Sequence, residues 1–458
     1  MWSNIKSVYE MHKKLIHFLG FAYGATIVFP AFGPALSVAV RENMPLMSTL
    51  AFLCYTISFL YPPSPKHSSR LNPKNVYKVI LVLSPGILYF DKLPILFQWG
   101  LLILFSLFTA QLGSAWTQYF RLTVKNEDRG KVASMSIALT FFILYVCTII
   151  IDYAPVRLAL LLPILLVLYS AKNLSDFYSN ALPPEPSIKV NSNHNRHYIL
   201  YILFIIIYIS GGFTYAGIFP KFVPYAFISK YYNVQPLFFT VIFAGFLADT
   251  LGRKPMLYIG FAMVGLSFTT FMIPASHTSY LLTQTFTQVG WGFVNTYVWT
   301  VSADLSVFYN KRTIAARGVS SMLFGTVLGA LVAYFFNQAQ FTLDILYAAA
   351  TLTPIFLGLI LVNFVPETLE FSYISTSKMD HDPDFIYSES ALLDVLTNRE
   401  KEIAILLIKN LTRNEICDTL NISINTLKTH IRHIYKKLDV TSKANLRMKM
   451  ESSKEKDA

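Results

Sequence analysis

The C-terminal part of the chain contains a stripe of side chains that could contact nucleic acid. Apolar residues recur there at offsets 0, 4, 7 and 11, and this spacing predicts one buried helix face: Leu427, Ile431, Ile434 and Leu438. The opposite face carries amide, hydroxyl and basic groups: Asn425, Lys428, Thr429, Arg432 and Lys436. Such groups read base edges and phosphates in the major groove of DNA. The stripe therefore predicts a DNA-recognition helix, and the alternative is a solvated basic face.

Capping signals place two further helices before this one. Thr397 with Glu400, and Thr412 with Glu415, form T-x-x-E capping boxes, each of which begins a helix. Residues 396–450 hold 11 Lys and Arg against 5 Asp and Glu, a net charge of +6. We therefore expect a compact, basic, helical domain in this region.

The run LTNREKEIAILL, followed by EICDTLNISINTLKTHIRHIYKKLDVTSK, resembles the LuxR-type helix-turn-helix of bacterial transcription regulators. The resemblance implies a four-helix domain in which Lys428, Thr429 and Arg432 point at bases. It places four more residues near phosphates: Thr412, Thr426, Lys436 and Lys437. Three residues depart from the usual pattern without removing a basic contact: Asn410, Thr412 and Cys417. Such domains usually bind as dimers on two half-sites, so double-stranded promoter DNA and a second copy of the chain are expected partners.

The rest of the chain has the composition of a protein dissolved in lipid. The whole chain is 54% hydrophobic and only 14% charged, whereas a soluble domain carries about 25% charged residues. Apolar stretches of about 20 residues, enough to cross a bilayer, recur along it. They fall near 15–38, 44–61, 76–93, 95–119, 132–151, 155–171, 197–218, 236–249, 256–274, 279–303, 318–337 and 342–364. The fold class predicted is all-α, with a twelve-helix transmembrane bundle before the C-terminal domain.

The charges in the loops orient this bundle. If the N-terminus is cytoplasmic, the inside loops hold 16 Lys and Arg and the outside loops hold 5. Basic residues concentrate on the cytoplasmic side of membrane proteins. We therefore expect a multi-pass protein of the bacterial inner membrane, with both termini in the cytoplasm.

The bundle divides into two halves of six spans. The polar segment 172–196 separates halves of about 1–175 and 197–365, a linker covers 366–395, and the last domain covers 396–458. Short sequences recur at equivalent places in both halves, Gln111-Leu-Gly with Gln288-Val-Gly and Arg129-Gly130 with Arg317-Gly318. Such echoes indicate a duplicated six-helix unit.

A charged loop motif lies between the predicted eighth and ninth spans. It contains Gly245, Asp249, Gly252, Arg253 and Lys254, which suit a tight turn with a carboxylate that pairs with a base or a helix N-terminus. This resembles the loop signature of the major facilitator superfamily. The equivalent loop of the first half reads PPSPKHSSRLNPK and has lost the pattern. The motif either staples the loop or gates a conformational switch.

Polar and aromatic residues share one face of the predicted tenth span, at offsets 0, 4, 7, 11, 15 and 18: Gln284, Gln288, Trp291, Asn295, Trp299 and Ser302. The fourth span carries a smaller set: Gln111, Ser114 and Gln118. Amides are costly against lipid, so these residues should face the bundle interior. They line a candidate ligand cavity near the midplane, or they hydrogen-bond one helix to another.

These features favour a membrane-embedded transcription regulator whose tail binds promoter DNA and whose bundle senses a small-molecule ligand or anchors the chain. The alternative is a secondary transporter with a regulatory DNA-binding tail. No catalytic motif stands out, so no enzyme activity and no cofactor are expected. His430 and His433 are three residues apart, a spacing that could bind metal, but the LuxR-type pattern itself carries histidine at the first position. No metal site is therefore expected.

Overall fold

The computed structural model divides the chain into two compact units, residues 1–368 and 369–458, and each is described by itself. The structure describes the following residues: 2–31, 34–39, 44–61, 73–179, 197–218, 232, 235–274, 276–309, 311–339, 344–365, 395–408, 416–417, 420, 422–440 and 445–446. Within these ranges every regular element is a helix.

The first half of the membrane unit consists of these helices: α1 (Trp2–Thr26), η1 (Ile27–Ala31), α2 (Pro34–Ala39), α3 (Met44–Leu60), α4 (Pro73–Leu88), η2 (Phe90–Lys92), α5 (Ile95–Thr123), η3 (Asn126–Asp128), α6 (Arg129–Tyr153) and α7 (Val156–Ser179). The first predicted span, 15–38, is interrupted. Phe29 has φ −158° and ψ 129°, the extended conformation that a residue before a proline prefers, and Pro30 follows.

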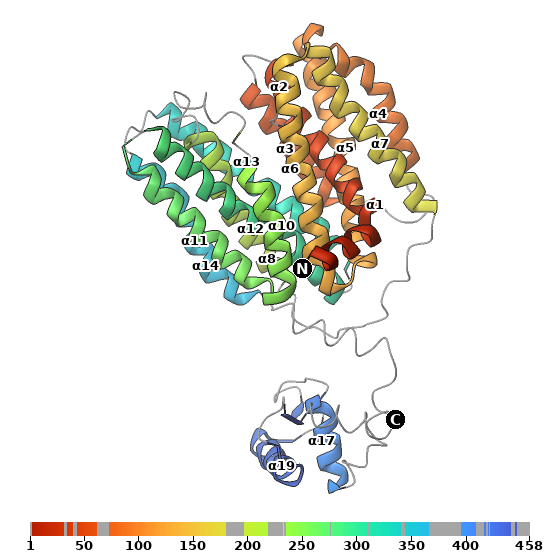
Figure 1. Cartoon of the computed structure of the whole chain (residues 1–458), viewed down its shortest axis with the longest axis vertical. Helices are drawn as coiled ribbons and strands as arrows, with labels where there is room; N and C mark the ends of the chain where they lie inside the picture. Colours follow the sequence, from red (N-terminus) through yellow and green to blue (C-terminus); the bar gives the residue numbers. More distant parts are fainter. Residues whose placement is uncertain are drawn as a thin grey trace. The chain divides into compact units, whose positions relative to one another are not determined.

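The second half repeats the pattern with these helices: α8 (His197–Phe213), η4 (Thr214–Ile218), α10 (Gln235–Leu251), α11 (Lys254–Phe271), α12 (His277–Phe308), α13 (Thr313–Gln338), α14 (Asp344–Leu361) and η6 (Val362–Phe364). Figure 1 shows the two halves as separate groups of helices, the first coloured red to yellow and the second green to cyan.

The contacts between the halves follow a two-fold pattern. The α6 helix packs on α10, and α3 packs on α13. Counting α1 to α2 as one element, each pair joins the fifth long element of one half to the second of the other. A pseudo-two-fold axis relating two inverted or parallel repeats produces this exchange of partners. The packing therefore agrees with a duplicated six-helix unit.

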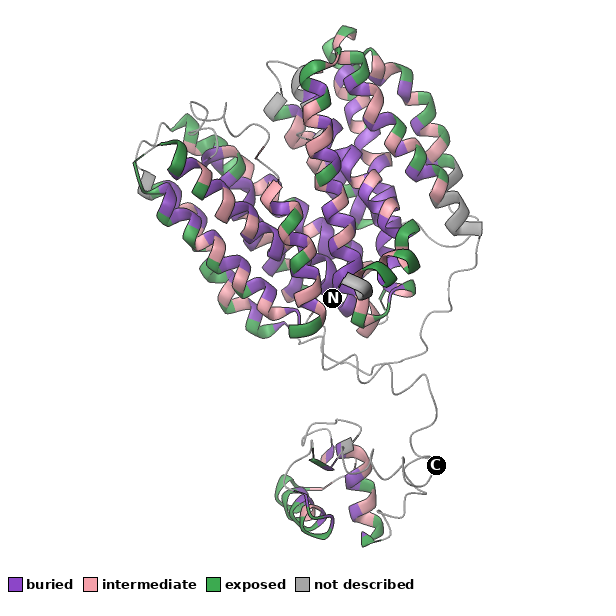
Figure 2. Ribbon diagram, viewed as in Figure 1, coloured by how far each residue is buried: buried purple, intermediate pink, exposed green. Residues whose placement is uncertain are grey.

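Six helices of the described residues are long and apolar enough to cross a membrane: Ile95–Thr123, Asn126–Tyr153, Val156–Asn173, His197–Ile218, Thr313–Gln338 and Leu346–Phe364. Three shorter apolar helices accompany them: Leu46–Leu60, Asn75–Leu88 and Gln235–Leu251. Large apolar side chains such as Leu96, Phe239 and Phe356 are exposed on the outside, while the interior is buried (Figure 2). Exposed apolar surface of this extent suits lipid rather than water. The first unit is a helical membrane domain.

The C-terminal unit has a small apolar core of its own. Its described helices are α17 (Asn398–Ile408) and α19 (Ile424–Lys437). The core consists of Leu396, Ile403, Ala404, Leu407, Ile416, Leu427, Ile431, Ile434, Leu438, Val440 and Leu446. All four residues of the predicted apolar face of the last helix belong to it.

Candidate functional site

The first helix of the C-terminal unit begins at the predicted capping box. Glu400 Oε2 accepts a hydrogen bond from the Thr397 backbone N–H at 2.8 Å, and Thr397 Oγ1 accepts from the Glu400 N–H at 3.4 Å. Glu400 also accepts from Lys437 Nζ at 2.6 Å, so it ties α17 to the end of α19. Its side chain is buried. This one carboxylate therefore joins the start of α17 to the end of α19.

Acid should destabilise this unit through Glu400. Burial alone would raise the pKa of Glu400 above 4.5. Hydrogen bonds from Lys437 and Thr397 outweigh burial and lower the pKa to about 2. The stability that this carboxylate contributes is complete above pH 4.5 and is lost as the pH falls towards 2. We expect the free energy of unfolding of residues 369–458, measured by urea titration with circular dichroism, to fall over this window.

A Glu400→Gln variant provides the control for this pH dependence. It should be less stable than wild type by about 1–2 kcal/mol at neutral pH, because the cap and the charged hydrogen bond are weakened. Its stability should also depend less steeply on pH below 4.5. An equal slope in both proteins would show that other carboxylates cause the acid sensitivity.

The α19 helix buries one face and exposes the other. Ser423 begins it, with its hydroxyl accepting from the Thr426 N–H at 3.1 Å. The residues proposed to contact DNA on this helix are all exposed: Asn425, Thr426, Lys428, Thr429, Arg432, Lys436 and Lys437. The structure thus brings seven of the eight predicted contact residues onto the solvent face of one helix. The eighth, Thr412, lies outside the described residues.

Some of these side chains are engaged within the domain. Thr429 Oγ1 donates to the Asn425 carbonyl at 3.1 Å, and Thr426 Oγ1 lies 2.9 Å from Ser423 Oγ. Lys437 is held by Glu400 and is 37% exposed. By contrast, four side chains make no hydrogen bond or ion pair with the described part of the domain: Asn425, Lys428, Arg432 and Lys436. These four are the groups most available to a ligand.

A buried ion cluster joins the two halves of the membrane unit. It consists of Asp249, Arg253, Asp304 and Arg129, whose side chains are 2–8% exposed. Arg253 donates to Asp249 Oδ1 at 2.6 Å and to Asp304 Oδ2 at 3.0 Å. Arg129 donates to Asp304 Oδ1 at 2.8 Å. Since Arg129 belongs to α6 and the others to the second half, the cluster spans the junction.

Asp249 also caps a helix of the other half. Its two carboxylate oxygens accept hydrogen bonds from the backbone N–H groups of Gly130 at 2.7 Å and Lys131 at 2.9 Å, at the start of α6. A carboxylate is stabilised there by the free N–H groups and the positive end of the helix dipole. The loop motif therefore contacts the other half through Asp249 and also pairs within its own loop through Arg253. Gly252, with φ 100°, makes the turn that returns Arg253 to this position.

Sequence reasoning identified half of this cluster. Asp249 and Arg253 were found from the loop motif, with the correct classes of partner. Asp304 and Arg129 were not assigned to it, although Arg129-Gly130 is one of the repeated sequences.

The α6 and α10 helices approach closely beside the cluster. A Cβ atom built on Gly245 would collide with Ser134 and with the Gly130 carbonyl. We expect Gly245→Ala to destabilise the bundle by about 1–3 kcal/mol, as overpacking does. Thermal unfolding in detergent would measure this effect.

A second glycine substitution supplies the control. A Cβ atom on Gly265 of α11 meets nothing within 4 Å, so Gly265→Ala should be neutral or stabilising by up to about 1 kcal/mol, as alanine is in a helix. If both variants lose the same stability, the close approach of α6 and α10 is not what requires glycine.

The polar face of the tenth span lies inside the bundle, on α12. Gln284, Gln288, Trp291, Trp299 and Ser302 are buried, and Asn295 is half-buried. Two tyrosines from the neighbouring α8 and η4 reach this face. Tyr208 donates to Asn295 Oδ1 at 2.8 Å, and Tyr215 donates to Gln288 Oε1 at 3.2 Å.

The end of this face nearest the ion cluster meets the first half. The Trp299 ring centroid lies 5.4 Å from that of Trp116 and 5.9 Å from that of Tyr23. Among the described residues, the polar side chains of the fourth span form hydrogen bonds with partners outside the α12 face. Gln111 donates to the Ser58 carbonyl at 3.0 Å, and Gln118 donates to the Arg312 carbonyl at 2.9 Å. Helix–helix hydrogen bonding therefore accounts for part of both sets.

Several polar atoms of these sets remain without a partner among the described residues: Trp291 Nε1, Trp299 Nε1, Gln288 Nε2, Gln111 Oε1 and Ser114 Oγ. A buried donor or acceptor without a partner costs about 1–3 kcal/mol. Native structures keep few such groups, and those they keep often belong to functional sites.

Comparison with known proteins decides the nature of the C-terminal unit. Residues 394–450 match the family described as "Bacterial regulatory proteins, luxR family". They form a LuxR-family helix-turn-helix domain. The match covers both described helices, the Glu400 cap and the whole exposed face of α19. The LuxR-type domain supports a role in DNA binding and transcription regulation.

The membrane unit has a likeness among solved structures. A bacterial homologue of the iron transporter ferroportin, in an outward-facing state, is 14% identical with a TM-score of 0.51. The alignment covers 77% of this chain and 98% of that one. At this identity the likeness shows the fold alone. No curated protein matches the chain. Among the described residues, no group of three His, Cys, Asp or Glu could hold a metal ion.

Proposed function

We propose that the chain is a membrane-embedded transcription regulator, whose LuxR-type domain binds promoter DNA while the bundle holds it at the membrane. The observation that carries this proposal is the exposed basic and amide face of α19. The same domain has an apolar core and a Thr397–Glu400 cap among its described residues. Lys428, Thr429 and Arg432 would read bases. Thr412, Thr426, Lys436 and Lys437 would lie at phosphates, and Asn425 would contact DNA at the start of the helix.

The proposal includes the topology of the bundle. Twelve spans in two halves of six would place both termini on the same side of the bacterial inner membrane. We propose that this side is the cytoplasm, where DNA is accessible. The excess of basic residues in the inside loops supports this orientation. The pairing of α6 with α10 and of α3 with α13 supports the six-plus-six division.

The bundle would sense a small-molecule ligand at the polar face of α12. The unpaired indole N–H groups of Trp291 and Trp299 and the Gln288 amide support a ligand that carries hydrogen-bond acceptors. The ion cluster would be the part that switches between two arrangements, formed and broken, because it joins the two halves of the bundle. A ligand shifts such an equilibrium only if it binds one arrangement more tightly. The outcome would be a change in the population of paired LuxR-type domains on DNA.

Selection of binding sites from random DNA by residues 369–458 tests the DNA-binding half of the proposal. We expect one half-site sequence to be enriched, with a two-fold repeat if the domain binds as a dimer. Failure to enrich any sequence, with residual binding unchanged in Lys428→Ala and Arg432→Ala, would refute it.

The second candidate function is secondary transport with a regulatory tail, favoured by the likeness to a transporter homologue. Substrate-driven flux by the bundle in proteoliposomes would support it, and lack of flux across a substrate panel would count against it. A bundle that serves only as an anchor makes a different prediction. Regulation would then be normal after Gln284, Gln288 and Asn295 are replaced by leucine, whereas a sensor would lose its response.

A further inference from the structure

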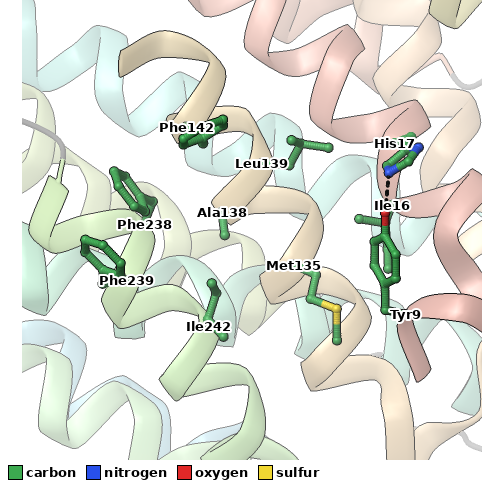
Figure 3. Close-up of a pocket in the computed structure, with 10 residues that line it drawn as sticks. All are labelled: Tyr9, Ile16, His17, Met135, Ala138, Leu139, Phe142, Phe238, Phe239 and Ile242. Carbon is green, nitrogen blue, oxygen red and sulfur yellow. Dashed lines mark hydrogen bonds between the residues drawn. The ribbon is translucent and has the colours of Figure 1, made fainter. Parts of the chain in front are cut away.

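An apolar groove lies on the side of the membrane unit, where the two halves meet. Residues of α1, α6 and α10 enclose a volume of about 320 Å³ (Figure 3). The lining residues are Tyr9, Ile16, His17, Met135, Ala138, Leu139, Phe142, Phe238, Phe239 and Ile242. The groove therefore combines α1 and α6 of the first half with α10 of the second.

The walls of the groove are mostly apolar. The two polar side chains, Tyr9 and His17, satisfy each other through a hydrogen bond of 2.9 Å between the hydroxyl and Nε2 (Figure 3). The other lining side chains are aliphatic, aromatic or thioether groups. An apolar cavity of this kind does not hold water. Its occupant should be hydrocarbon.

The groove opens sideways, towards the lipid. Phe142 and Phe239 on its rim are 48% and 66% exposed, and they are continuous with the exposed Phe243 of α10. In a bundle that spans a membrane, such side chains contact acyl chains. The hydrocarbon that enters the groove thus comes from the surrounding bilayer.

One face of α1 adds positive charge beside the groove. Lys6, Tyr9, Lys13, Ile16 and His17 follow helical spacing, so both lysines lie on the same face as the lining residues. Both lysines are exposed.

Lys13 forms only an exposed ion pair, so its ammonium remains available to a lipid phosphate. Lys13 pairs with Glu10 at 2.9 Å, and both side chains are about half exposed. An exposed pair of this kind contributes little, so a phosphate can compete for the ammonium. Lysines next to a membrane helix attract anionic lipids.

We propose that this groove binds an acyl chain of an anionic glycerophospholipid, whose phosphate lies beside Lys6 and Lys13. The acyl chain would occupy the junction of α6 with α10, the two helices that contribute Arg129, Asp249 and Gly245. A bound lipid would therefore stabilise the packing of α6 on α10 that the structure shows. The site goes beyond DNA binding and beyond the polar face of α12.

Photolabelling of the full chain in phosphatidylcholine vesicles tests the proposal. A trace of phosphatidylglycerol with a diazirine in one acyl chain is added, and labelled residues are mapped by peptide mass spectrometry. We expect label on Met135, Leu139 and Ile242 in excess over the exposed Phe356 and Ile360 of α14. Phosphatidylcholine with the same diazirine chain should label the groove less, by about fivefold for each lysine that contacts the phosphate.

Three variants make this test specific. Ala138→Trp fills the groove and should abolish its labelling while α14 is still labelled. Ala349→Trp adds the same bulk to the exposed side of α14 and should leave the groove labelled. Lys13→Gln should reduce only the preference for phosphatidylglycerol, and it changes nothing inside the bundle.

Equal labelling of the groove and of α14 would overturn the site, as would labelling unaffected by Ala138→Trp. Equal groove labelling by the two lipids would overturn the proposed preference for an anionic headgroup. None of these readouts involves DNA, so they remain separate from a failure of the proposed regulatory function.

Discussion

Replacing Asp304 by asparagine should lower the free energy of unfolding of the membrane unit by about 3–5 kcal/mol, the cost of breaking a buried ion pair by removing one partner. Asp304 accepts hydrogen bonds from both Arg129 and Arg253, and all three side chains are buried. The substitution removes the negative charge that lies between two guanidinium groups. The carboxylate that still pairs with Arg253, that of Asp249, also lies 4.0 Å from Lys131 Nζ. Unfolding in detergent micelles, followed by circular dichroism, would measure the loss.

Asp91→Asn is the matched control for this prediction. Asp91 pairs with the exposed Lys92 at 3.7 Å, at the end of a helix in the same unit. Exposed pairs of this kind contribute about 0–1 kcal/mol. A double-mutant cycle of Asp304→Asn with Arg129→Gln would isolate the coupling across the junction. If Asp304→Asn and Asp91→Asn lose similar stability, the cluster does not hold the halves together.

The second large effect is expected on DNA. Lys428→Ala and Arg432→Ala should each weaken binding to the selected site by about 1–3 kcal/mol, roughly tenfold to a hundredfold, if each contacts a base. Both side chains are exposed and make no hydrogen bond or ion pair with the described part of the domain, so their removal should leave the fold intact. Fluorescence anisotropy with labelled DNA at fixed salt would give the affinities.

Two further variants distinguish contacts with bases from electrostatic attraction to the DNA backbone. Lys436→Ala should weaken binding to all sequences alike and lower the salt dependence by about one ion, as loss of a phosphate contact does. Lys401→Ala, on α17, removes the same charge from a helix that is not expected to enter the groove. Equal losses in Lys401→Ala and Lys428→Ala would mean that α19 does not read the bases.

The local features of the C-terminal unit could be predicted from the sequence because they depend on near neighbours. The T-x-x-E cap at Thr397 and the buried face of α19 follow from spacing alone. The contact of Lys437 with Glu400 could not be predicted, since the two residues lie 37 positions apart and meet only when α17 and α19 pack. A phosphate contact by Lys437 would therefore have to share its ammonium with Glu400.

The same distinction applies to the membrane unit. Burial of the α12 face followed from helical spacing and the cost of amides in lipid. Its partners Tyr208 and Tyr215 come from another helix, and no local pattern marked them. The Arg129–Asp304 pair lies 175 positions apart and forms only where the halves meet. Sequence reasoning therefore recovered the faces of the helices, but not which faces contact each other.

The most direct test of the central claim is binding of the full chain, held in lipid nanodiscs, to the DNA site selected by residues 369–458. A membrane-embedded regulator should bind that site at least about 10³-fold more tightly than a scrambled site at physiological salt, the lower end of specific recognition. Equal affinity of the nanodisc-held chain for both sites would contradict the account.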